Sequence, residues 1–196
     1  MVIDFHTHTF PDKIAEQTIA ALAAKSGNTP YRGGTLDALR ESMRKNGVDY
    51  SVILPVATKP SQVPSINRLA ASLNGTDGVI YAGCIHPLCE DVEAVLEDIR
   101  QSGLFGLKIH PDYQFTDFDD PKYLHILREA AKRDLVVVTH AGVDVGFPDT
   151  VRCTPVRNTI LLMLSNGEKS IFGPYFFPST QIVTLRFAKS ASNRIW

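Results

Sequence analysis

Two hydrophobic patterns alternate along the first 140 positions of the chain. Short apolar runs rich in β-branched residues predict strands that are covered on both faces. Between these runs, apolar residues recur at intervals of three and four, which predicts amphipathic helices that end at glycines. The predicted strands begin at Val2 and Ile3 and continue at residues 49–55, 79–86, 104–110 and 135–140.

This repeated order of strand and helix predicts an α/β fold with a parallel sheet, because parallel neighbours need a crossover connection. The predicted strand ends at Pro55, His86, His110 and His140 follow one another at intervals close to the roughly 30 residues of a βαβ unit. We therefore predict a TIM-barrel-like (β/α)8 fold, of which about five N-terminal β/α units are present. A doubly wound sheet is the alternative, but the glycine-rich phosphate fingerprint that often follows its first strand is absent.

Histidines mark the ends of these strands. Of the six histidines, five lie at or just beyond the carboxyl end of a predicted strand, which is the active-site face of a (β/α)8 barrel. On an extended first strand His6 and His8 share one face. Neutral imidazole binds zinc, and a catalytic zinc site needs about three protein ligands, so this pair supplies part of a metal site.

Composition narrows the classes of function. The chain has 196 residues, 44% of them hydrophobic, which suits one domain with a substantial core. Its formal net charge of -1 gives no reason to expect nucleic acid or an anionic membrane as partner, so we expect a small-molecule substrate. No apolar run approaches the roughly 20 residues of a membrane span and no secretory segment is evident, so we expect a cytoplasmic protein. Three scattered cysteines, Cys84, Cys89 and Cys153, are expected to be reduced thiols.

Three segments carry a resemblance to a known family. The opening DFHTHTF, the strand end GLKIHPDYQ and the segment VVVTHAG resemble the metal-dependent amidohydrolase superfamily, specifically its amidohydrolase-2 branch, which also contains aminocarboxymuconate-type decarboxylases. The resemblance implies a (β/α)8 barrel that holds Zn²⁺ or another divalent ion such as Mn²⁺, with His6, His8 and His140 as ligands. The sixth-strand histidine and the eighth-strand aspartate of the family have no counterpart that we can find, so no catalytic residue is assigned.

The resemblance implies a metal-dependent hydrolase that uses a metal-activated water on a small-molecule amide, ester or lactone. Three neutral imidazoles would leave the ion its positive charge, which acidifies water and polarises a carbonyl. Two alternatives stay open. One is a nonoxidative decarboxylase of the same superfamily, and the other is an inactive truncated fragment or pseudoenzyme, because the late histidine and aspartate are missing.

Lys108 and His110 share a face of their strand and are predicted to bind a substrate carboxylate. A structural role for Lys108, paired with an acidic side chain, is an equal alternative. A third, less favoured alternative is a carboxylated lysine that bridges two metal ions, as in other amidohydrolase branches.

The end of the chain differs from the rest. We assign residues 1–157 to a partial barrel domain and residues 158–196 to an atypical tail, which has room for about one βα unit of roughly 30 residues. We interpret the chain as truncated after the fifth strand, with an out-of-frame or disordered tail. The alternative is a short divergent protein that pairs with another chain. If the chain is truncated, exposed barrel edges are predicted to cause homo-oligomerisation or aggregation.

Overall fold

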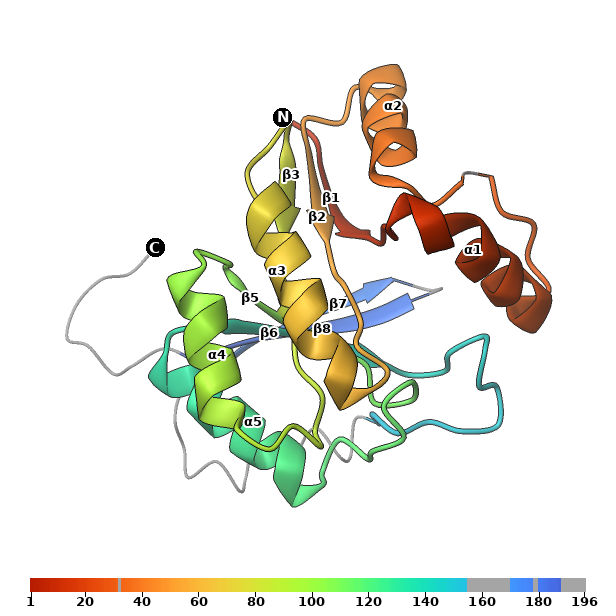
Figure 1. Ribbon diagram of the computed structural model, residues 1–196. Coiled ribbons are helices and arrows are strands. Elements are labelled where there is room, and N and C mark those ends of the chain that lie inside the picture. Colours follow the sequence, from red (N-terminus) through yellow and green to blue (C-terminus); the bar gives the residue numbers. More distant parts are fainter. Residues whose placement is uncertain (32, 155–169, 178–179, 188–196) are drawn as a thin grey trace.

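The computed structural model describes residues 1–31, 33–154, 170–177 and 180–187, the last two ranges by their backbone (Figure 1). Parallel strands and helices alternate as far as residue 141, and two further strands follow. The strands are β1 (Ile3–Thr7), β2 (Tyr50–Ile53), β3 (Val79–Tyr81), β4 (Gly83–Cys84), β5 (Gly106–Ile109), β6 (Val136–Ala141), β7 (Ser170–Phe177) and β8 (Thr180–Phe187). The helices are α1 (Asp12–Ser26), α2 (Leu36–Asn46), α3 (Val63–Leu73), α4 (Val92–Gln101) and α5 (Pro121–Lys132), with a short 3₁₀ turn at Pro60–Gln62.

The strands follow one another in the order expected of a barrel. Strands β1, β2 and β3 form one parallel sheet, and β4, β5 and β6 are the parallel part of a second. The predicted single strand at residues 79–86 is divided at Ala82, so that its first half pairs with β2 and its second half pairs with β5. The prediction of an α/β fold that contains part of a (β/α) barrel is confirmed.

Side chains on the two faces of the sheets have different partners. On the helix-covered face, buried side chains such as Ile53, Leu107 and Val137 join the main core, to which α4 contributes Leu96 and α5 contributes Ile126. On the other face a smaller cluster contains Val52, Leu54, Ala82 and Val138. Its location matches the interior of a barrel.

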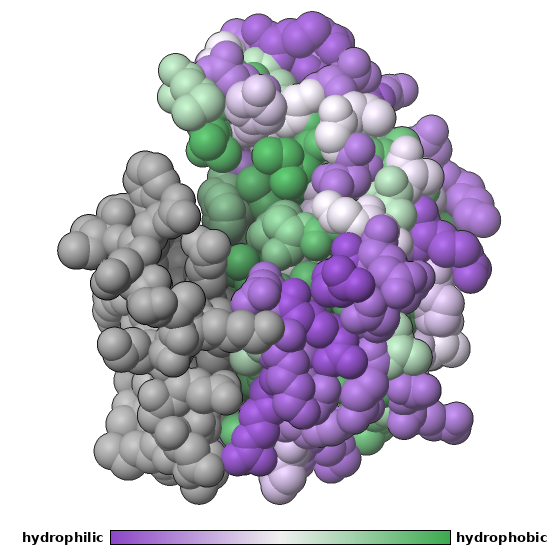
Figure 2. Space-filling model, turned by 90° about the vertical axis from the view of Figure 1, so that its left-hand side faces the viewer, coloured by the Kyte–Doolittle hydropathy of each residue, from purple (hydrophilic) through white to green (hydrophobic). Residues whose placement is uncertain are grey.

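Within the described residues, β1 lies at one edge of the first sheet and pairs only with β2. Its pairing with β2 shifts register between Asp4 and Thr7, which indicates a bulge. The hydrophobic side chains of Val2, Ile3 and Phe5 are between 44% and 53% exposed on this edge. Hydrophobic side chains also gather on the face of the molecule shown in Figure 2.

The tail continues the second sheet in a different way. Strand β8 pairs antiparallel with β6, and β7 pairs antiparallel with β8, whereas a further barrel unit would add a parallel strand. The predicted tail begins at residue 158, but residues 155–169 and 188–196 lie outside the described part of the chain, so the domain boundary and the origin of the tail stay predictions. Among the described residues, no helix has the length and apolarity that a membrane span requires.

Candidate metal site

His6 lies in β1 and His8 lies just beyond its end. Their Nε2 atoms are 3.0 Å apart. The Nδ1 atom of His8 lies 2.8 Å from the carbonyl oxygen of Leu54. Because a carbonyl only accepts, His8 donates from Nδ1, and its Nε2 keeps the lone pair when the ring is neutral. Two nitrogens bound to one zinc ion at about 2.0–2.1 Å lie roughly 3.3 Å apart in tetrahedral geometry, so the observed spacing suits two ligands of one ion.

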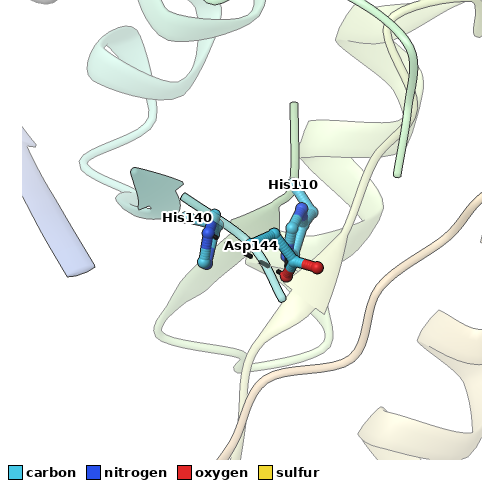
Figure 3. Close-up of side chains that lie close together, drawn as sticks. All are labelled: His110, His140 and Asp144. Atoms are coloured by element: carbon cyan, nitrogen blue, oxygen red, sulfur yellow. Dashed lines mark ion pairs between the residues drawn. The ribbon is translucent and has the colours of Figure 1, made fainter. Parts of the chain in front are cut away.

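His110, His140 and Asp144 form a second group, drawn in Figure 3, at the ends of β5 and β6. Their ligand atoms all lie within 4.8 Å of one another. The Nε2 atom of His110 is 3.4 Å from Asp144 Oδ2, and that of His140 is 4.0 Å from the same oxygen. The two imidazole rings are stacked with their centroids 4.3 Å apart. Within the described residues, His140 Nε2 and His110 Nδ1 are buried without a hydrogen-bond partner.

Lys108 lies among these histidines. It is 1% exposed, and its Nζ atom has no hydrogen-bond partner within the described residues. Burial lowers the pKa of Lys108 to about 7, although Cys153 and Asp144 act in the opposite direction. The predicted alternative of a structural lysine paired with an acidic side chain finds no direct partner here, and substrate binding stays a prediction.

The histidines influence one another electrostatically. Burial is the largest cause that lowers the pKa of His6 to about 3, and repulsion from Lys108 is the next. The same two causes lower the pKa of His8 to about 4; this side chain keeps exposed surface, but the protein atoms around it still remove much of its water. Burial and repulsion from His110 lower the pKa of His140 to about 3. All three imidazoles are therefore neutral near pH 7, as a metal ligand must be.

Asp144 is an ionised carboxylate. The hydrogen bond from His110 is the main cause that lowers its pKa, and the backbone amide of Gly146 also donates to it, over 2.7 Å. Its partner His110 has a pKa lowered by burial, which Asp144 partly offsets.

The structure thus brings the four predicted histidines to one end of the sheets, around Lys108, the fifth sequence-predicted site residue. His6, His8 and His140 do not form a tight triplet. Among the described residues, the groups with ligand atoms within 4.8 Å are His110, His140 and Asp144, and a cluster of Glu93, His125 and Glu129 on α4 and α5. Glu129 already binds Arg133 and Lys132, so the second cluster is a network of ion pairs.

Sequence reasoning missed Asp144 and Gln114. Asp144 follows His140 by four residues in the loop after β6, and that short spacing from a strand-end histidine is the only signal. Gln114 is buried and joins three loops: it accepts from the amide of His110 and donates to the carbonyl oxygens of Ala57 and Ile85. It also accepts a hydrogen bond from Tyr123.

A cleft of about 550 Å³ adjoins the site without containing it. Lys59, His86, Phe115 and Arg152 are among the residues that line it, and none of the five predicted site residues does. Gln114 lies between the two, since it lines the cleft and binds the backbone of His110. Because the chemistry resides in the convergent histidines, we place the candidate site there and treat the cleft as a neighbour.

Most of the chain matches a model of a known protein family. A family model described as amidohydrolase, Amidohydro_2, matches residues 3–186. No curated protein matches the sequence.

Solved structures share the fold at low sequence identity. The IDCase of Metarhizium anisopliae in apo form is 18% identical, with a TM-score of 0.56 over 71% of this chain and 50% of that one. A mutant of 5-carboxyvanillate decarboxylase from Novosphingobium aromaticivorans, with bound manganese and 3-methoxy-4-hydroxy-5-nitrobenzoic acid, is 16% identical, with a TM-score of 0.57 over 85% of this chain and 55% of that one. The chain therefore spans about half the length of the solved structures that it matches.

Proposed function

Because this chain belongs to the amidohydrolase family Amidohydro_2, whose members are metal-dependent decarboxylases and hydrolases, we propose that it is a metal-dependent hydrolase. The substrate is a small amide, ester or lactone that carries a carboxylate. The observation that carries this proposal is the ionised carboxylate of Asp144 beside His110 and His140.

The donor types present fit a divalent ion, and binding would have to draw His6, His8 and His140 closer together than they lie in the metal-free site, where they do not form a tight triplet. His6, His8 and His140 offer neutral imidazoles, and His140 Nε2 is a buried nitrogen without a partner among the described residues. We propose these three as ligands and Zn²⁺ or Mn²⁺ as the ion; manganese is the metal bound in the decarboxylase from N. aromaticivorans. A divalent ion held there would polarise a substrate carbonyl and lower the pKa of water.

We propose Asp144 as the general acid–base, a role for which no residue could be assigned from the sequence. Its carboxylate is ionised at neutral pH and is fixed by the Gly146 amide and by His110. In the proposed reaction Asp144 accepts a proton from the attacking water and returns it to the leaving group. General acid–base catalysis of this kind contributes about 10²- to 10⁴-fold in rate.

Lys108 is proposed to hold the carboxylate of the substrate. Its amine is buried and has no acidic side chain within hydrogen-bond distance in the described chain, so an anionic ligand would supply the charge that it lacks. Because its pKa is about 7, binding of a carboxylate favours the protonated form.

The second candidate is nonoxidative decarboxylation of a small carboxylic acid. It is favoured by the similarity in fold to a 5-carboxyvanillate decarboxylase. In that reaction Asp144 would first take up a proton from water and would then deliver it to the carbon whose carboxylate leaves as CO₂. Release of CO₂ from 5-carboxyvanillate would identify this activity, whereas a hydrolase would incorporate oxygen from labelled water into the product.

Asp144→Asn is the first test of the proposed hydrolase. We expect the variant to lose about 10²-fold or more in rate on a panel of carboxylated esters, lactones and anilides assayed with Zn²⁺ or Mn²⁺. Asp149→Asn is the matched control, because Asp149 is an exposed carboxylate in the same loop. Metal content of both variants should match that of the unmodified chain.

Two outcomes would overturn the proposal. Equal rates for Asp144→Asn and Asp149→Asn would remove Asp144 from the chemistry. A chain that binds no more metal than a His6→Ala, His8→Ala double variant, and turns over no member of the panel, would instead be an inactive fragment.

A further inference from the structure

Helix α1 follows the metal-site histidines of β1 and is weakly attached to the rest of the protein. Of its fifteen residues only Ala15 is fully buried. Its start is joined to the loop that follows it by the hydrogen bond from the Phe10 amide to the Gly34 carbonyl. In Figure 1, α1 extends away from the sheets, and its far end approaches the loop after β6.

Lys25, in the last turn of α1, contacts that loop. Its Nζ atom lies 3.3 Å from the ring centroid of Phe147 and 5.2 Å from that of Tyr113. The two rings are packed edge to face with centroids 5.1 Å apart, and Tyr113 is packed in the same way against His110 at 4.6 Å. A continuous line of contacts therefore runs from Lys25 to His110.

The loop that carries Phe147 also carries Asp144. The amide of Phe147 donates to the carbonyl oxygen of Asp144 over 2.9 Å, and the amide of Gly146 donates to its carboxylate over 2.7 Å. The turn is close to its neighbours, because a Cβ atom on Gly146 would lie 3.2 Å from the Tyr113 hydroxyl and 3.3 Å from Lys25 Cδ. The position of Phe147 therefore affects the position of the Asp144 carboxylate.

We propose that Lys25 is a positioning residue for this site. By holding Phe147 against Tyr113, it keeps Asp144 beside His110, and α1 acts as a lid whose release loosens the site. The contribution of this contact to catalysis rests on the proposed function, whereas the contact itself does not. An exposed cation–π contact is weak, so the lid would open often.

Amide hydrogen exchange of the full chain, measured by NMR without metal or substrate, tests the proposal. In Lys25→Met the amides of Gly146 and Phe147 should exchange about two to five times faster, the factor that corresponds to one exposed cation–π contact. Lys25→Arg should keep the exchange rates of the unmodified chain, because a guanidinium also binds an aromatic face. Lys13→Met is the matched control at the other end of α1, where no ring contact is present among the described residues.

A second variant, Phe147→Leu, keeps an apolar side chain and removes the aromatic face, so it should reproduce the effect of Lys25→Met. Amides of β6, such as that of Val138, should be unchanged in every variant. Unchanged exchange at Gly146 and Phe147 in Lys25→Met, or an equal increase in β6, would overturn the proposal. Since no metal or substrate is present, neither result depends on whether the hydrolase proposal is correct.

Discussion

At the scale of one residue, the burial of Lys108 is unfavourable for folding but suits the proposed binding of a substrate carboxylate. An ammonium group that is 1% exposed and has no hydrogen-bond partner in the described chain loses its hydration without compensation. Burial accordingly lowers its pKa to about 7. Residues with strongly shifted pKa values concentrate at functional sites, which is why we place Lys108 in the substrate-binding group.

The histidines make the free energy of unfolding of the metal-free protein depend on pH. Folding lowers the pKa of His6 and His140 from 6.5 to about 3, and that of His8 to about 4. Below pH 6.5 the unfolded chain therefore binds protons that the folded chain does not, and the free energy of unfolding should fall as the pH decreases from about 6.5 toward 4. Urea denaturation between pH 7 and 5, with a chelator present, measures this slope.

A His6→Gln, His8→Gln double variant is the control, because it removes two of the three groups. Its free energy of unfolding should change less between pH 7 and 5 than that of the unmodified chain. An identical slope for both proteins would show that these imidazoles titrate normally.

The residues of the site were predictable to different degrees. Side chains alternate along a strand, so His6 with His8, and Lys108 with His110, could be assigned to common faces from the sequence. Their ligand roles stay predictions. Asp144 lies in a loop without a periodic pattern, and its location depends on a turn closed by the amide of Gly146, so its four-residue spacing from His140 does not by itself place the carboxylate.

At the scale of one element, β5 and β6 approach so closely that one position accepts only glycine. A Cβ atom on Gly106 would lie 2.0 Å from the backbone oxygen of Val136, its partner in register. We expect Gly106→Ala to reduce the free energy of unfolding by about 1–3 kcal/mol, because a backbone would have to shift. Chemical denaturation measures the change.

Gly33→Ala is the matched control, since nothing lies within 4 Å of the Cβ that it would add. It should change the free energy of unfolding by less than about 0.5 kcal/mol. A similar loss in both variants would mean that the contact between β5 and β6 is not what requires glycine at residue 106.

The elements themselves were largely predictable, and their connections less so. The apolar run at residues 79–86 predicts one strand but not the change of partner at Ala82, because both halves are equally apolar. The pairing of β7 and β8 was not predicted, because Gly173 and Pro174 interrupt that segment in the sequence. Strand order depends on long-range pairing, which the local pattern does not contain.

At the scale of the whole molecule, β1 lies at an edge of the described sheet and exposes apolar side chains where a closed barrel would have a neighbouring strand. We propose that copies of this chain associate through that edge. Ile3→Lys should reduce the association, because a charged side chain on an edge strand opposes further pairing. Light scattering coupled to size-exclusion chromatography at two protein concentrations measures it.

Ile14→Lys is the control, because Ile14 is similarly exposed, at 42%, but belongs to α1 and not to the edge strand. It should leave the association unchanged. A monodisperse monomer for the unmodified chain at both concentrations would contradict the proposed association.

The proposed ligands His6 and His8 precede His140 by more than 130 residues, and this separation affects the timing of assembly during synthesis. At about 5–20 residues per second, roughly 7 to 27 seconds separate the appearance of β1 from that of β6. During that interval the nascent chain would present His6 and His8 without the third proposed ligand, and two imidazoles would hold an ion weakly. The metal ion would therefore bind after folding, and the availability of ions would affect only folded molecules.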